Sequence, residues 1–89
     1  MQLDYTVQIW REGDQFVAHA LPLDVMSSGK TVDEARKALD EAVRLFLGTS
    51  TETGTLELVL EEAGYERRGD RWESPAWVSI EKHSVAMAG

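Results

Sequence analysis

The 89-residue sequence contains no cysteine. A disulfide framework, a thiolate metal site and a cysteine nucleophile are therefore excluded. No apolar run approaches the roughly 18 residues of a membrane span, and Met1–Asp4 does not open a basic and then apolar signal peptide. We therefore expect a small soluble protein of the cytoplasm, because the absence of cysteine fits a reducing compartment.

Basic residues are also few, with nine Lys and Arg against sixteen Asp and Glu, for a formal net charge of −7. Such a surface repels phosphate backbones, which disfavours broad nucleic-acid binding and favours a basic partner. The 43% of hydrophobic and 28% of charged residues are typical of a globular domain. A chain this short buries only about 60–65% of the surface that its unfolded form exposes, so self-association is a natural way to bury more.

Alternating apolar and polar residues predict a half-buried strand over residues 3–10, with Trp10 on the polar parity. The residues expected to face the core are Leu3, Tyr5, Val7 and Ile9. Residues 11–14 have turn chemistry and residues 15–21 alternate again, which predicts a hairpin. A short third strand is expected around Val25–Ser28, after Pro22 interrupts hydrogen bonding.

A capping box at Thr31 and Glu34 predicts the start of a helix, because each side chain can bond the other residue's backbone N–H. An apolar stripe at three- and four-residue steps then runs as far as Phe46. Gly48 stands where a left-handed C-terminal residue is wanted, so we expect the helix to end there.

The second half of the chain predicts a loop at 49–54, a short helix at 56–63, a Gly69-Asp70 turn and a β-rich closing strand at 77–85. Together the elements predict an α+β fold, an antiparallel sheet of three to four strands with helices packed on one face, in the order β-β-β-α-(α)-β.

We expect one domain over residues 1–89. Its core is the β-β-β-α unit of residues 1–47, and residues 48–89 add the short helix plus a closing strand or hairpin. Nothing in residues 48–89 predicts a separate DNA-binding domain.

Several short motifs follow one another along residues 3 to 47. They are Phe16-Val17-Ala18-His19, Leu23-Asp24-Val25, Ser27, Gly29, Thr31-Val32-Asp33-Glu34-Ala35 and Ala42-Val43-Arg44-Leu45-Phe46-Leu47. In this order they resemble the HicB-like antitoxin family. The family usually has a proline two residues before the Leu-Asp-Val stretch, where this chain has Leu21, with Pro22 one step later.

The resemblance implies a β-β-β-α-β domain, often described as a partial ribonuclease H fold, that binds and silences a small ribonuclease toxin. It also implies association into homodimers or larger homo-oligomers. Many family members add a C-terminal ribbon-helix-helix or helix-turn-helix module, which this chain lacks, so binding to an operator is not expected.

A ribonuclease H-like ancestry invites a search for carboxylates that hold two Mg²⁺ ions. Asp4, Asp24 and Asp40 are the only conceivable contributors. They fall at the start of a strand, in a loop and on the polar side of a helix, so we expect solvated carboxylates, no metal site and no cofactor.

His19 is the residue best suited to act as a general base at neutral pH. No serine, cysteine or carboxylate stands at a spacing that would activate or orient it, so we interpret His19, like His83, as non-catalytic. The basic cluster of Arg67, Arg68 and Arg71 is interleaved with acids, which is more typical of a solvated hairpin tip than of a nucleic-acid clamp.

Trp10 is a large apolar side chain on the polar parity of its strand, and tryptophan is enriched among interface anchors. Trp72 and Trp77 are expected to pack under the second helix. Acidic faces on the two helices can complement a basic protein. The residues that we assign to a partner interface are Trp10, His19, Asp24, Asp40, Glu41 and Glu61.

These features lead us to expect a non-enzymatic, antitoxin-like binding protein that neutralises a small basic ribonuclease toxin, similar to the toxins of the HicA type, by occlusion. One alternative is a stand-alone oligomeric HicB-like domain that has no toxin. A vestigial metal-dependent nuclease is the less favoured one.

Overall fold

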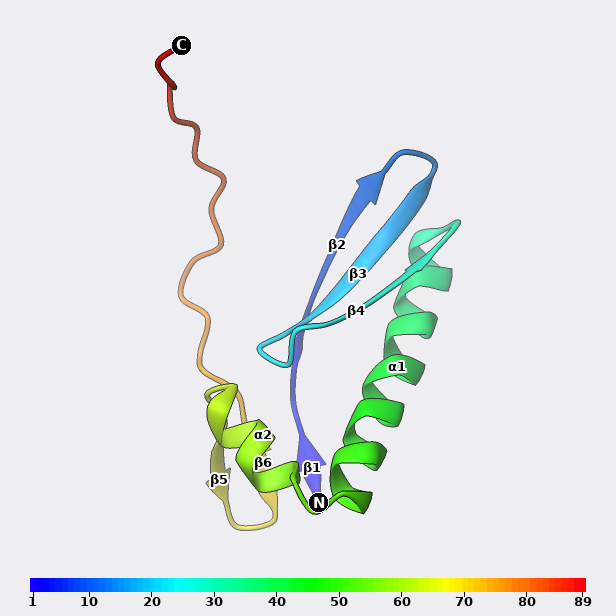
Figure 1. Ribbon diagram of the computed structural model, residues 1–89, viewed down its shortest axis with the longest axis vertical. Helices are drawn as coiled ribbons and strands as arrows, with labels where there is room; N and C mark the ends of the chain where they lie inside the picture. The colour runs from blue at the N-terminus through cyan, green and yellow to red at the C-terminus, as the bar shows by residue number, and fades with distance from the viewer.

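The computed structural model describes residues 1–89 and shows two three-stranded sheets joined by a long helix (Figure 1). The elements in chain order are β1 (Gln2–Leu3), β2 (Thr6–Glu12), β3 (Gln15–Leu21), β4 (Val25–Gly29), α1 (Val32–Glu52), α2 (Leu56–Glu62), β5 (Glu66–Arg68) and β6 (Arg71–Glu73). The expected α+β fold is therefore confirmed. None of the helices combines the length and the apolarity needed to cross a membrane.

The larger sheet has the antiparallel order β2-β3-β4. A two-residue turn joins β2 to β3, and Gly13 takes the positive φ of 61° that such a tight turn requires. The register sets Ile9 opposite Ala18 and Ala18 opposite Ser27, on the face that α1 covers. Ala18 and Ala20 are fully buried, and their small side chains allow α1 to approach the sheet closely.

The first turn of α1 is capped much as the sequence predicts. The Thr31 hydroxyl accepts a hydrogen bond from the Glu34 backbone N–H at 3.1 Å. The Glu34 carboxylate accepts from the backbone N–H of Lys30, at 3.0 Å, rather than from that of Thr31. Both bonds satisfy groups that an uncapped helix start leaves free.

The predicted end of the helix at Gly48 is wrong, because α1 continues to Glu52. The hydroxyls of Ser50 and Thr51 donate to the carbonyls one turn earlier, and the Ser50 side chain is buried. The expected loop at 49–54 is therefore mostly helical. The chain turns at Gly54, which has the left-handed φ of 72°.

The smaller sheet has the order β1-β6-β5, in which β1 runs parallel to β6 and β5 and β6 form an antiparallel hairpin. The hairpin that the Gly69-Asp70 turn predicts is confirmed. Trp72 is buried in the hydrophobic core, which also contains Leu60 of α2. The buried apolar residues are Ala18, Ala20, Leu23, Ala35, Leu39, Val43, Leu60, Tyr65 and Trp72.

The strand predicted over residues 3–10 is broken at Asp4 and Tyr5, so that β1 and β2 belong to different sheets. At this break, Asp4 forms hydrogen bonds with residues in the second half of the chain. Its carboxylate accepts from the Ser74 backbone N–H at 2.7 Å, and its carbonyl accepts from the Tyr65 hydroxyl at 2.6 Å. No pattern within residues 3–10 encodes these distant partners.

The predicted closing strand at Trp77–Val85 is absent. Residues 75–89 form an extended segment that we call the C-terminal arm, and all of its residues are exposed. Figure 1 shows the C-terminal arm leaving the region of α2 and standing clear of the larger sheet. Trp77 lies in the C-terminal arm and therefore does not pack under α2. A β-prone sequence needs a neighbouring strand to bond, and no strand of the chain lies paired with these residues.

Replacing Gly29 by alanine should destabilise the fold by about 1–3 kcal/mol, because the added Cβ would lie 2.6 Å from the backbone nitrogen of Ala35. Gly48→Ala is the matched control. Its Cβ meets no atom within 4 Å in the middle of α1, so it should stabilise by about 0.5–1 kcal/mol. Urea unfolding measures the free energy of unfolding of the two variants. Equal effects would contradict the close approach of β4 to α1.

Candidate functional site

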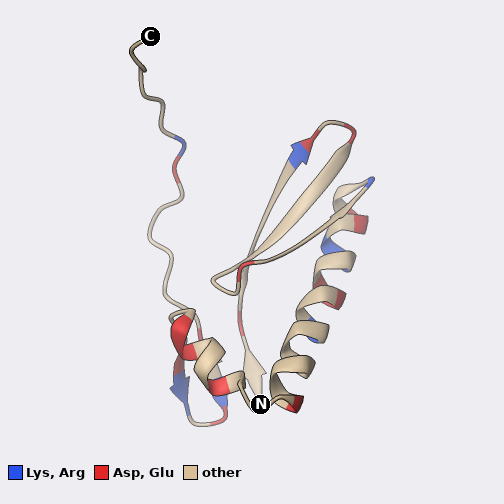
Figure 2. Ribbon diagram, in the orientation of Figure 1, with Lys and Arg blue, Asp and Glu red and all other residues tan.

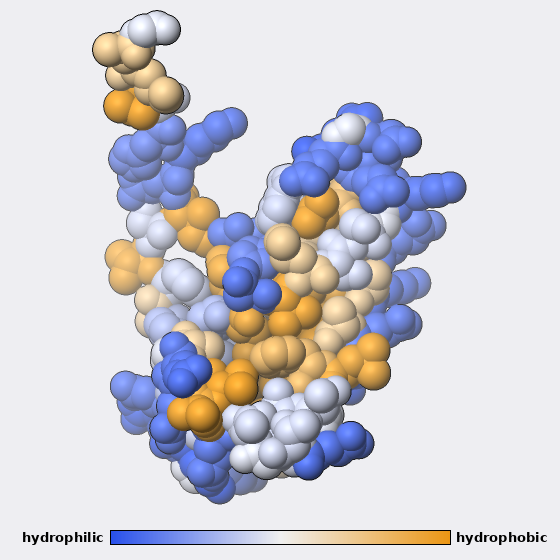
Figure 3. All heavy atoms as spheres, in the orientation of Figure 1, coloured by the Kyte–Doolittle hydropathy of each residue, from blue (hydrophilic) through white to orange (hydrophobic).

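The face of the larger sheet that turns away from α1 carries a patch of apolar and aromatic side chains. The register sets Trp10 beside Val17 and His19 beside Met26, all on this face. We call these four residues the outer-face patch. Met26 is 57% exposed, and the other three are half-buried. Figure 3, which shows one side of the molecule, has hydrophobic side chains gathered in the middle, between hydrophilic side chains at the β2–β3 turn and along α1.

His19 is held between an aromatic ring and a carboxylate. Its Nε2 lies 2.6 Å from Oδ1 of Asp24, and its ring meets that of Trp10 edge to face, with centroids 6.0 Å apart. The expectation that no carboxylate orients His19 is therefore wrong. The turn between β3 and β4 brings Asp24 back over β3, and Asp24 adopts the left-handed φ of 62° there. A contact that depends on a turn of this kind is not visible in residue spacing.

Trp10 lies on the outer face, as its parity predicts. Its indole Nε1 donates a hydrogen bond to the Glu12 carboxylate at 3.0 Å, which satisfies the polar end of the ring. The apolar body of the ring then remains available beside Val17 and His19. Such a side chain, oriented by neighbours and uncovered by any other element, has the character of an interface anchor.

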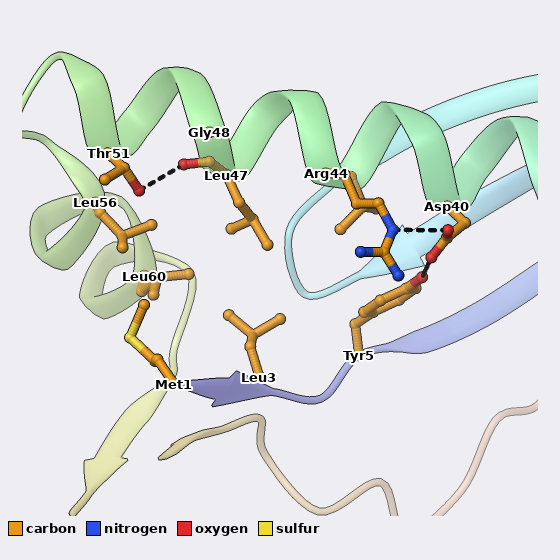
Figure 4. Close-up of a pocket in the computed structure, with 11 residues that line it drawn as sticks. Met1, Leu3, Tyr5, Asp40, Arg44, Leu47, Gly48, Thr51, Leu56 and Leu60 are labelled. Atoms are coloured by element: carbon orange, nitrogen blue, oxygen red, sulfur yellow. Dashed lines mark hydrogen bonds and ion pairs between the residues drawn. The ribbon is translucent and has the colours of Figure 1, made fainter. Parts of the chain in front are cut away.

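A second feature is an apolar cleft of ≈ 300 Å³ between α1, α2 and β1 (Figure 4). Asp40 stands at one end, where it accepts hydrogen bonds from the Tyr5 hydroxyl at 3.5 Å and from Arg44 Nε at 2.9 Å. Burial, and after it the negative charge of Asp40, raises the pKa of the Tyr5 hydroxyl. Asp40 is therefore engaged within the chain and largely neutralised by Arg44.

The outer side of α1 is less acidic than the sequence suggests. Asp33 is paired with Arg36 at 2.6 Å, as Asp40 is with Arg44, and blue and red alternate along the helix in Figure 2. Glu41 is exposed and makes no ion pair within the chain. The expectation of an acidic face on α1 is wrong in this respect, because helical spacing brings a base one turn from each of two acids.

The end of α2 keeps its negative charge. Glu57 is paired with Arg67 at 3.0 Å, whereas Glu61 and Glu62 are exposed and make no ion pair within the chain. These two carboxylates stand in the last turn, where no basic residue is present and the helix dipole is itself negative. The local potential therefore favours a cationic neighbour.

The three carboxylates considered for a metal site, Asp4, Asp24 and Asp40, each form hydrogen bonds with different partners. Asp4 binds the Ser74 backbone, Asp24 binds His19, and Asp40 binds Tyr5 and Arg44. The hydrogen bond from Ser74 lowers the pKa of the Asp4 carboxyl. No group of three or more His, Asp or Glu side chains in the structure is arranged to hold a metal ion.

Two of the three arginines in the basic cluster of the β5–β6 hairpin are paired with acids within the chain. Arg67 pairs with Glu57 and lies over the ring of Trp72, with its guanidinium carbon 5.8 Å from the ring centroid. Arg68 pairs with Glu73 at 3.0 Å. This arrangement agrees with the interpretation of the hairpin as a mixed-charge, solvated tip.

The six residues assigned to a partner interface thus fall on three separate surfaces. Trp10, His19 and Asp24 come together on the outer face, Asp40 and Glu41 lie on the flank of α1, and Glu61 lies at the end of α2. Val17 and Met26 complete the outer-face patch, and Val17 shares the parity of His19 along its strand. No family model, curated protein or solved structure matches the chain.

The folded chain should lose stability as the pH rises above about 10. Burial raises the pKa of Tyr65, and that of Tyr5 is raised as well, so both hydroxyls ionise more readily in the unfolded chain. Their contribution is complete below pH 10 and is lost as the pH rises towards the folded pKa values.

Urea midpoints at pH 8 and pH 10.5 test this dependence. At pH 8, Tyr65→Phe should cost about 1 kcal/mol, through the lost hydrogen bond to the Asp4 carbonyl. The midpoint of the variant should then fall less than that of the wild type between the two pH values. A parallel fall in both proteins would show that Tyr65 is not responsible.

Proposed function

We propose that this chain is a non-enzymatic, antitoxin-like binding protein of the cytoplasm. It neutralises a small basic ribonuclease by covering the surface that RNA needs. The observation behind this proposal is the outer-face patch, in which Trp10 and an oriented His19 are left uncovered on a strongly acidic molecule.

The outer-face patch has the composition of an interface centre. Binding energy in protein interfaces is concentrated in a few aromatic and apolar side chains that lose their water on association. The Trp10 ring and the Met26 side chain supply such area, while the pair of His19 and Asp24 supplies polar groups beside it. Asp24 is well exposed and faces solvent on its far side, where it can meet a base of the partner.

Charge supports the choice of a basic partner. The net charge of −7 attracts a cationic protein over a distance, which raises the association rate more than the final affinity. Glu41, Glu61 and Glu62 have no internal counter-charge and contribute most directly to this field. A ribonuclease that binds RNA through basic groups has the complementary surface.

Part of the order of the elements, between β1 and α2, is the one that the resemblance to HicB-like antitoxins leads us to expect. β2, β3, β4 and α1 follow one another as β-β-β-α, and the motifs that resemble the family lie in these elements and in the short connections between them. This agreement concerns architecture and adds weight to an antitoxin-like role.

Co-purification from the native host tests the proposal. The tagged chain should recover a small basic protein that degrades RNA when isolated and stops doing so when this chain is added back. Recovery of this chain alone would instead favour the stand-alone oligomeric domain. Cleavage of RNA by the purified chain with Mg²⁺ or Mn²⁺, abolished by Asp4→Asn, would favour the vestigial nuclease, which the separation of Asp4, Asp24 and Asp40 makes less attractive.

Replacing Trp10 by alanine should weaken inhibition of the ribonuclease by at least about 30-fold, the effect of losing an anchor worth about 2 kcal/mol. Leu45→Ala is the control, because Leu45 is an exposed apolar side chain of α1 that lies outside the outer-face patch. Circular dichroism should show that both variants are folded. Equal inhibition by the two variants would remove the outer-face patch from the interface.

Replacing Glu61 by lysine should slow association with the ribonuclease several-fold at low salt and have little effect at high salt. Asp14→Lys changes the net charge equally but lies in the β2–β3 turn, at the opposite end of the molecule from α2 (Figure 1). Stopped-flow measurement of the association rate at two ionic strengths compares the two variants. If both variants slow association alike, net charge alone steers the encounter and the end of α2 has no special part.

A further inference from the structure

The C-terminal arm has the composition of a strand but no sheet to join. Val78 is 98% exposed, Ile80 63% and Trp77 44%, and Val85 and Met87 are also exposed. β-Branched and aromatic residues of this kind are enriched in strands. Beyond Pro75 the C-terminal arm contains neither proline nor, before its last residue, glycine. In Figure 3 its hydrophobic side chains stand apart from the body of the molecule.

β2 is an unprotected edge of the larger sheet. It pairs with β3 on one side only, so the backbone N–H and C=O groups on its other side have no partner strand. Residues Thr6–Trp10 of β2 include no proline and no charged side chain, which are the usual means of blocking an edge. The opposite edge, β4, is the strand against which α1 packs most extensively.

The inner face of β2 is open as well. α1 packs on β4 and β3 and touches β2 little, so Val7 is 39% exposed although its parity points towards the core. This exposure belongs to a groove of ≈ 580 Å³, with Tyr5 and Val7 along one wall and four charged α1 residues, Arg36, Lys37, Asp40 and Glu41, along the other. A strand added beside β2 would place every second side chain in this groove, where apolar groups would cover Tyr5 and Val7.

The exposed area of the chain exceeds that of a compact monomer. A compact protein of 10.0 kDa exposes about 5,200 Å², whereas this chain exposes 6734 Å². Its radius of gyration is 15.4 Å, against about 12 Å for a compact domain of this length. The excess is about 1,500 Å², and a stable interface buries about 800 Å² on each partner. The surplus is therefore large enough to form a dimer interface.

We propose that the C-terminal arm of each copy pairs with β2 of a second copy and places Val78 and Ile80, which share one face of an extended strand, in the groove over Tyr5 and Val7. Every copy carries both a C-terminal arm and a free β2 edge. In a reciprocal exchange about a two-fold axis, each arm therefore gains a strand to pair with and each β2 edge is covered, without any other molecule. In this structure the C-terminal arm leads away from its own body. The exchange concerns assembly and does not depend on the proposed ribonuclease partner.

Light scattering of the purified chain tests the exchange. The full chain should have about twice the 10.0 kDa mass of a single chain, and a chain that ends at Pro75 should be a folded monomer. Ile80→Asp should raise the dimer dissociation constant at least tenfold. Ala88→Asp adds the same charge at the tip of the C-terminal arm and should leave the constant nearly unchanged. A monomeric full chain, or a truncated chain that still dimerises, would overturn the proposal.

Cross-linking identifies the acceptor. The chain has no cysteine, so Val7→Cys and Ile80→Cys introduce single reactive sites on two copies that carry tags of different size. A short bis-maleimide should join the two variants into a covalent heterodimer, and more weakly when Asp14→Cys at the hairpin tip replaces Val7→Cys. In a chain with both cysteines, cross-linking confined to one chain would show that the C-terminal arm closes on its own β2, which contradicts the exchange.

Discussion

The close packing of α1 on β3 and β4 is the interaction on which the rest of the structure depends. Ala18 and Ala20 present no side chain beyond a methyl group, so Leu39 and Val43 of α1 can approach the sheet there. Gly29 permits the same closeness at the start of the helix, since even a Cβ would meet the backbone of α1. A helix positioned over these small residues leaves β2 uncovered along its inner side.

Three parts of the molecule are left without a cover or a partner. The outer face of the sheet has no covering helix, the edge and groove of β2 have no covering strand, and the C-terminal arm has no sheet. A chain of this size has little apolar material with which to cover them. Each open surface is therefore suited to another molecule, and we assign the outer-face patch to a basic partner and the edge of β2 to a second copy of the chain.

The candidate site could be predicted from the sequence only in part. Parity along β2 and β3 placed Trp10 and His19 correctly on the side away from the core, because alternation is a property of each strand alone. The pairing of His19 with Asp24 depends on how the turn between β3 and β4 folds back. The Asp40 carboxylate forms an ion pair with Arg44 and accepts a hydrogen bond from Tyr5, so it is less available to a partner than its sequence position indicates. Val7 has the parity of a core residue, yet how well it is covered depends on where α1 lies over the sheet.

The sequence by itself determined the elements whose signals are local. The hairpin of β2 and β3, the capped start of α1 at Thr31 and the turn at Gly69 depend on residues a few positions apart. The tertiary structure alone decided the break at Asp4 and the absence of a closing strand at Trp77–Val85. Asp4 needs Ser74 and Tyr65, and a strand exists only where another strand accepts its hydrogen bonds. These are contacts between distant parts of the chain, and local patterns do not contain them.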